Sequence, residues 1–224
     1  MPEFLLLSAP EDGVAGVTLR RPERKNALSI ALRDEISDAL CALAANPAVK
    51  VVTLTGSGDT FCAGFDLKEF EEASDPAFAR RLWASSDRYH HACLDFPLPL
   101  VAAVNGPAIA GGFDLAVMCD LRIAVPETYF SHPEIAFGDV LYSPLHDLVG
   151  AAVARDLCLT GRRVDAEEAR ELRLVSRVVP RAELDEEVAR WAAMIARAPR
   201  EVLLRTKGKA IARARISSAG TLDL

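Results

Sequence analysis

The stretch VAAVNGPAIAGGFDLAVMCD, residues 101–120, organises the reading of this chain. The stretch begins inside the apolar run Leu100–Val104. The length and composition of this run are typical of a buried strand. Residues 105–107 end that run, and the small residues of 108–112 lead into a helical pattern. Such a junction leaves backbone N–H groups unpaired at the positive end of a helix dipole. These groups suit a developing negative charge, although a tight turn that uses glycine only for close packing has the same pattern.

A second stretch repeats this arrangement earlier in the chain. The apolar segment 49–55 predicts a strand, residues 56–60 a small-residue loop, and FCAGFDLK at 61–68 the start of a helix. Two junctions of this kind could each supply one N–H group to a single oxygen.

Four motifs follow one another in the chain: FCAGFDLKEF at 61–70, AAVNGPAIAGGFDLAVMCD at 102–120, HPEIAFG at 132–138 and LTGRRVDAEEARELRLVSRVV at 159–179. In this order they resemble the enoyl-CoA hydratase/isomerase, or crotonase, superfamily. The similarity begins at RRPERKNALS, residues 20–29. It implies an α/β fold, a crotonase-like spiral of repeated ββα units with a C-terminal helical region that is shortened here. We therefore expect a core with an acyl-CoA site at 1–180 and a truncated helical oligomerisation region at 181–224.

The composition narrows the class of protein. With 224 residues, half of them hydrophobic, the chain can bury a full core. The net charge of −6 argues against nucleic-acid or membrane-surface binding, and no apolar run is long enough to span a bilayer. The N-terminus is unlike a signal peptide, so we expect a cytoplasmic protein. The five cysteines are widely spaced without a C-x-x-C pair, and we expect them to be small core residues.

Apolar spacing predicts the remaining elements. They are a hairpin of strands at 4–8 and 14–20, a helix Ile30–Ala45 capped by Ser29, a helix at 77–91, a strand at 121–125, a short helix that begins with a capping box at Asp165 and Glu168, a strand at 174–179, and helices at 182–196 and Arg200–Ala214. His90 and His91 lie at the end of the helix at 77–91. Because adjacent helical residues diverge by about 100°, we interpret them as helix-end or partner contacts rather than metal ligands.

The resemblance implies where the chemistry takes place. The thioester oxygen of an acyl-CoA would be held by the backbone N–H groups of Phe65 and Gly111. Phe65 is bulkier than the alanine that is frequent in the family, so it either narrows the acyl pocket or packs under its loop. The positions of the family's two glutamates hold Asp114 and Glu134. One carboxylate can deprotonate water while the other delivers a proton to the α-carbon.

Two departures from the family pattern bear on the reaction. Asp114 is one methylene shorter than glutamate, which weakens the hydratase interpretation, and an acid in a first helical turn also stabilises the helix. After Gly138 the chain lacks the usual glycine-rich segment, and Tyr142, His146 and Asp147 stand where the far wall of the acyl pocket is expected. They either supply an extra acid or base or mark a different acyl shape.

For the CoA moiety, the resemblance implies two loops and a few residues near them. The candidates are Arg24, Lys25, Ala27, Leu28, Ala63, Asp66, Leu67, Lys68, Gly112 and Tyr142. Lys68 and Arg24 would lie near the phosphates, because their charged ends can reach exposed phosphate oxygens. Neither a metal nor a redox cofactor is expected, since coenzyme A is part of the substrate.

The predicted function is that of an enoyl-CoA hydratase of fatty acid metabolism, a lyase. The alternatives are a double-bond isomerase that uses Glu134 alone and a non-catalytic acyl-CoA-binding protein. A hydrolase is disfavoured because no G-x-S-x-G motif is present.

We also expect a homo-oligomer, a trimer as the basic unit with a hexamer left open. The reason is the apolar stripe of the two last helices, formed by Leu184, Val188, Trp191, Ile195, Val202, Leu203 and Ile211, which would need a partner surface. The last helix is also basic, but without interleaved aromatic residues we interpret its charges as a solvated face or a phosphate contact rather than a nucleic-acid site.

Overall fold

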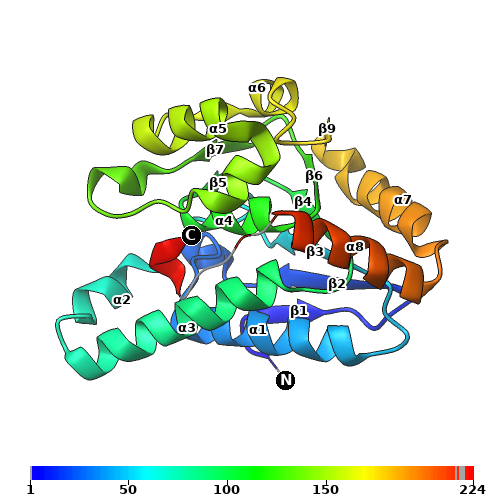
Figure 1. Cartoon of the computed structure of the whole chain (residues 1–224), viewed down its shortest axis with the longest axis horizontal. Coiled ribbons are helices and arrows are strands. Elements are labelled where there is room, and N and C mark those ends of the chain that lie inside the picture. Colours follow the sequence, from blue (N-terminus) through cyan, green and yellow to red (C-terminus); the bar gives the residue numbers. More distant parts are fainter. Residues whose placement is uncertain (1, 215, 217–219) are drawn as a thin grey trace.

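A six-stranded sheet forms the centre of the computed structural model, which describes residues 2–214, 216 and 220–224 (Figure 1). Its order is β1 (Leu5–Leu7), β2 (Val14–Leu19), β3 (Val51–Gly56), β4 (Leu100–Val104), β6 (Leu121–Ala124) and β9 (Arg177–Val178). Strand β1 pairs antiparallel with β2, and the other neighbours are parallel. A small second sheet consists of β5 (Ala108–Ile109), β7 (Tyr129–Ser131) and β8 (Val164–Asp165).

Helices follow most of the strands, as expected of parallel pairing. They are α1 (Ile30–Ala45), α2 (Leu67–Glu72), α3 (Pro76–Leu94), α4 (Gly111–Met118), α5 (Ser143–Thr160), α6 (Ala166–Glu171), α7 (Leu184–Ala196) and α8 (Arg200–Ala214). Short 3-10 turns occupy Pro22–Arg24, Pro133–Ala136, Arg181–Glu183 and Thr221–Asp223. Within the described ranges, none of the helices is long and apolar enough to cross a membrane.

The central sheet is covered on both faces, and the alternation of side chains along its strands shows this. In β4, Ala102 and Val104 belong to the larger core, whereas Val101 and Ala103 belong to a second core. Because successive strand residues point to opposite faces, a continuous apolar run is required here. Helices α1 and α3 pack together over the first face, and α7 packs on the second (Figure 1).

One expectation about α7 is wrong. Its apolar stripe does not need a partner surface, because Leu184 and Val188 are buried against residues of the sheet in the same chain. Trp191 and Ile195 pack at the edge of this second core. The stripe of α7 therefore does not itself argue for an oligomer, which stays a prediction.

The helix boundaries follow the sequence signals closely. Ser29 caps α1 and accepts a hydrogen bond from the Leu32 N–H at 3.3 Å, and Asp165 caps α6 through the Glu168 N–H at 2.9 Å. The strand expected at 174–179 is shorter, because only Arg177–Val178 pairs with β6. Cys41 is exposed, so the expectation that every cysteine is a core residue is wrong for that one.

The C-terminal segment also differs from expectation. The resemblance implies a helical region that extends to residue 224, but the last described residues form a 3-10 turn, Thr221–Asp223. Thr221 donates its N–H to Asp87 Oδ1 at 2.7 Å, and Leu224 O accepts hydrogen bonds from the N–H groups of Tyr142 and Ser143. This turn packs against α3 and the start of α5. Arg215, a basic residue just after the last helix, lies outside the described part of the chain, as do residues 217–219.

Candidate active site

The junction between β4 and α4 places backbone N–H groups at the start of the helix. Ala110 has φ +53° and ψ −129°, a conformation that non-glycine residues rarely adopt. The Ala110 N–H donates to Ser131 O at 2.8 Å, so the pairing of β5 with β7 fixes the loop in this shape. Helix α4 then begins at Gly111, in the place that the sequence predicts.

The two junctions meet backbone to backbone. Gly64 has φ +86°, and a Cβ atom there would lie 2.8 Å from the Ile109 carbonyl oxygen and 3.0 Å from the Gly111 nitrogen. Within the described residues, neither the Phe65 nor the Gly111 N–H donates a hydrogen bond. Two free donors on adjoining loops are the arrangement that an oxyanion hole requires.

The Phe65 side chain packs under its loop. The Arg33 guanidinium carbon lies 4.4 Å from the centre of the ring, and the Phe70 and His90 rings have centroids 6.2 and 6.1 Å away. On the Gly111 side, a Cβ atom would lie 2.9 Å from Phe65 Cδ1. The ring is therefore wedged between Arg33 and Gly111.

Three titratable side chains gather next to the start of α4. Asp114 lies three residues after Gly111, on the same side of the helix. His132, at the end of β7, donates its Nε2–H to Asp114 Oδ1 at 2.8 Å, and both side chains are buried. Glu134 follows in the turn Pro133–Ala136, and one ligand atom from each of the three lies within 4.8 Å of the others.

Burial sets the protonation of this cluster. It raises the pKa of Glu134 to about 7, although the nearby His132 opposes the shift. Glu134 Oε2 is buried without a hydrogen-bond partner among the described residues. Burial also disfavours the imidazolium of His132, but the charge and hydrogen bond of Asp114 outweigh it, and the pKa of His132 is raised well above its ordinary value. Glu134 can therefore both give and take a proton near neutral pH.

His132 is a site residue that the sequence reasoning missed. The motif HPEIAFG contains it, but the resemblance assigns a role only to Glu134 in that motif. The ring stacks on Phe113, with centroids 4.5 Å apart and planes at 23°. Only the pairing of β5 with β7 brings it to Asp114, and sequence spacing does not reveal that pairing.

The same three side chains could hold a divalent cation, with one nitrogen and two carboxylate oxygens. In the structure His132 and Asp114 already satisfy each other directly, which accounts for their proximity without an ion. The prediction of no metal stays a prediction.

The predicted CoA-binding segments lie side by side. The Ala63 N–H donates to Lys25 O at 3.0 Å, and Leu28 pairs with Phe65 in a parallel bridge. Ala27 and Leu28 are buried, whereas Lys25, Leu67 and Lys68 are exposed. The two loops thus form one continuous surface with a lysine on each.

The remaining candidates have structural partners of their own. Arg24 lies 3.1 Å from Asp66, whose carboxylate also caps α2 through the Lys68 N–H. Gly112 packs so tightly that a Cβ atom would lie 2.1 Å from Cys62 O. Tyr142, half-buried before α5, has its ring 5.3 Å from that of the exposed His146. Among the described residues, no hydrogen bond, ion pair or ring contact joins Tyr142 or His146 to Asp114 or Glu134.

Asn26 and His90 show further features that the sequence did not predict. The fully buried Asn26 amide donates to Ser57 O and Thr60 O at 2.9 and 2.8 Å, which ties the first CoA segment to the loop after β3. His90 is not a helix-end or partner contact, because it is buried within α3 and donates its Nδ1–H to Ser86 O at 2.9 Å.

Known proteins resemble this chain in sequence and in fold. Residues 9–221 match the family model described as enoyl-CoA hydratase/isomerase. The chain belongs to the enoyl-CoA hydratase/isomerase family. The expected crotonase-like α/β fold is confirmed, since the chain superimposes on an enoyl-CoA hydratase/isomerase from Xanthobacter autotrophicus with a TM-score of 0.88. The two are 34% identical, over 95% of this chain and 80% of the other.

Other members of the family are similarly related. A putative enoyl-CoA hydratase of Thermus thermophilus is 41% identical over 207 residues, 87% of this chain and 82% of its own. A probable mitochondrial enoyl-CoA hydratase of Dictyostelium discoideum is 38% identical over 87% of this chain and 71% of its own. The structure of the enoyl-CoA hydratase of Mycobacterium smegmatis has a TM-score of 0.87 at 33% identity, over 96% of this chain and 84% of that one.

Proposed function

We propose that this family member is an enoyl-CoA hydratase, which adds water across the 2,3 double bond of a 2-enoyl-CoA thioester. The observation that carries the proposal is the pair of carboxylates, Asp114 and Glu134, with oxygens within 4.8 Å of each other beside two free N–H donors. A water that accepts or donates hydrogen bonds of about 2.8 Å to both oxygens can span this separation.

The residues divide the reaction between them. The N–H groups of Phe65 and Gly111 receive the thioester oxygen. The Asp114 carboxylate takes a proton from the bound water as the water oxygen bonds to C3, and the C2–C3 π pair moves into a thioester enolate. The enolate collapses as protonated Glu134 delivers its proton to C2. Return of the proton from Asp114 to Glu134 restores the site, and their closeness favours that return.

Isomerisation of a 3-enoyl-CoA is the second candidate, and one observation favours it. Asp114 Oδ1 already accepts a hydrogen bond from His132 Nε2 at 2.8 Å, so this oxygen is engaged by a side chain rather than by a water. Glu134 Oε2 is buried without a hydrogen-bond partner among the described residues, and isomerisation needs only one group that removes a proton at C2 and returns it at C4. A purely non-catalytic acyl-CoA-binding protein would have no use for a buried acid of this kind.

Incubation of the purified protein with crotonyl-CoA and with 3-hexenoyl-CoA tests the proposal. Hydration of crotonyl-CoA removes the absorbance of the conjugated thioester and adds the mass of one water. Conversion of 3-hexenoyl-CoA to a conjugated product without hydration of either would support the isomerase instead. Binding without turnover of either thioester would overturn both and leave the binding protein.

The remaining expectations stay predictions. They are a trimer as the basic unit, a role in fatty acid metabolism, a cytoplasmic location and chemistry without a cofactor. Light scattering after size exclusion at micromolar concentration tests the first, because an obligate interface of more than about 2,000 Å² survives dilution.

A further inference from the structure

We propose that Arg33, on α1, is a positioning residue of the oxyanion hole. It fixes the Phe65 N–H by holding the Phe65 ring and the segment paired with it. The inference rests on the proposed function, because it concerns the stabilisation of a thioester enolate.

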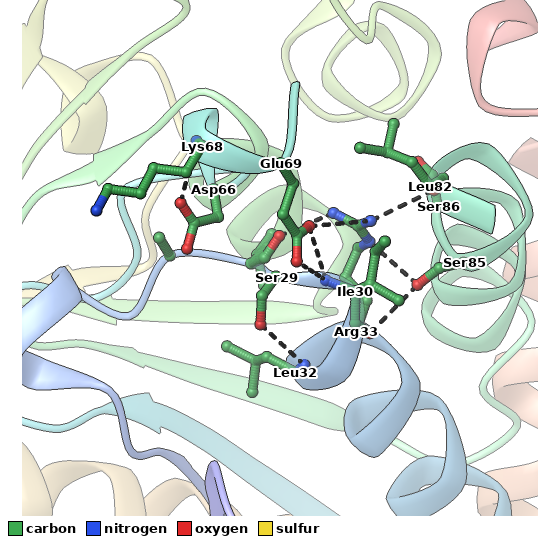
Figure 2. Close-up of polar contacts among 12 residues, drawn as sticks. Ser29, Ile30, Leu32, Arg33, Asp66, Lys68, Glu69, Leu82, Ser85 and Ser86 are labelled. Carbon is green, nitrogen blue, oxygen red and sulfur yellow. Dashed lines mark hydrogen bonds and ion pairs between the residues drawn. The ribbon is translucent and has the colours of Figure 1, made fainter. Parts of the chain in front are cut away.

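Arg33 is buried completely and bonded in several directions (Figure 2). Its guanidinium donates to Leu28 O at 2.8 Å, and to Leu82 O and Ser85 Oγ at 3.3 Å each. The carboxylate of Glu69 lies 3.8 Å away and supplies the opposite charge. A buried cation is retained only when its donors are satisfied, and here the partners come from α2, α3 and the loop before α1.

The carbonyl group that Arg33 binds belongs to the support of the first donor. Leu28 O also accepts the Asp66 N–H at 3.3 Å, and the Leu28 N–H donates to Gly64 O at 2.8 Å. These two bonds bracket Phe65 on both sides in the chain. Displacement of Leu28 would therefore move the Phe65 N–H.

The Phe65 ring provides a second connection. Arg33 stacks on it at 4.4 Å, and Gly111, which carries the second donor, lies against the same ring. An arginine suits this position because its planar guanidinium can stack on a ring while it donates hydrogen bonds around its edge. A lysine could supply the charge but not the flat surface.

Glu69 completes the support from α2. Both of its carboxylate oxygens lie 2.9 Å from the Ile30 nitrogen, at the first turn of α1 (Figure 2). This contact fixes the position of the carboxylate beside Arg33. The network thus ties α1 and α3 to the helix that follows the oxyanion loop.

The test measures enolate stabilisation directly. Acetoacetyl-CoA ionises to an enolate with its own near-ultraviolet absorbance, and titration of the bound thioester gives the apparent pKa of that step. The hole of the native protein should lower this pKa relative to free acetoacetyl-CoA. We expect Arg33→Met to raise it again by about one unit or more, with kcat for crotonyl-CoA about 10- to 100-fold lower and KM changed less than about threefold, as for a donor displaced by about an ångström.

Arg122→Met is the matched control, because Arg122 is also buried and bonded to backbone carbonyl groups, including Leu174 O at 2.6 Å, but does not contact Phe65. If Arg33→Met and Arg122→Met lower thermal stability alike and leave the bound enolate unchanged, the proposal is overturned. Arg33→Lys is a second variant, in case Arg33→Met does not fold. We expect the pKa of its bound acetoacetyl-CoA to lie between the values of the native protein and Arg33→Met. A pKa equal to that of the native protein would contradict the stacking argument. If the native protein does not lower the enolate pKa at all, the proposed function itself fails, which separates the two failures.

Discussion

The donors of the proposed oxyanion hole are backbone N–H groups, whereas the neighbouring acid cluster consists of three titratable side chains with ligand atoms within 4.8 Å of one another. The donors of the hole are the N–H groups of Phe65 and Gly111, held by backbone contacts and a wedged ring. Asp114, His132 and Glu134 are held by charge and by the pairing of β5 with β7. Because backbone N–H groups do not titrate, we expect the pH dependence of the reaction to come from the acid cluster rather than from the donors of the hole.

The largest effect is expected from Glu134→Gln. The amide cannot carry a proton, so hydration and isomerisation should both fall by about 1,000-fold or more, while acyl-CoA still binds to the intact hole. Turnover of both thioesters in discontinuous assays measures the loss of activity. Calorimetric titration with butyryl-CoA measures the retained binding. The exposed Asp139 provides the control variant Asp139→Asn. Activity close to that of the native protein would remove Glu134 from the reaction.

Asp114→Asn should separate the two reactions. Only hydration needs a second group to deprotonate water, so its kcat should fall about 100-fold, and isomerisation should change by less than about fivefold. Parallel assays of the purified variant with crotonyl-CoA and 3-hexenoyl-CoA give the ratio. An equal loss in both reactions would mean that Asp114 supports the site through His132 rather than acting on water.

The pH profiles should run in opposite directions. Hydration needs protonated Glu134, whose pKa is about 7, so kcat/KM should fall about tenfold per pH unit above that value. Isomerisation needs the ionised form, so kcat/KM should fall by the same factor per unit below it. Profiles between pH 5 and 9 for each thioester test this, and profiles with the same slope would contradict the assignment of roles.

Phe65→Leu should have the smallest effect and no pH dependence. Loss of the stacked ring loosens the first donor, and we expect kcat to fall about tenfold at every pH, because no charge changes near Glu134. Measurement of kcat across the same pH range, with Phe70→Leu as the control for the loss of a neighbouring ring, checks this. A shifted pH profile would show that the hole and the acid cluster are not independent.

The sequence indicated the two strand-to-helix junctions more directly than the partnership of Asp114 with His132, for a physical reason. Strand, small residues and helix start are local patterns, so both junctions could be found within short windows, and the family resemblance then assigned the donors to Phe65 and Gly111. The partnership of Asp114 with His132 depends on two strands that meet only in the folded chain. In the same way, the apolar stripe of α7 packs against strands that are far away in sequence. The sequence pattern does not show this packing, so the prediction that the stripe needs a partner surface was wrong.

The conformation of Ala110 links catalysis to folding cooperativity. An alanine at positive φ is costly by about 1 kcal/mol or more, and a free peptide would leave that conformation at once. It is held by the Ser131 carbonyl, 21 residues later in the chain, and by the tight packing around it. A partly folded chain therefore cannot have an aligned second donor, and loss of activity in denaturant should report the separation of β5 from β7 before the larger sheet unfolds.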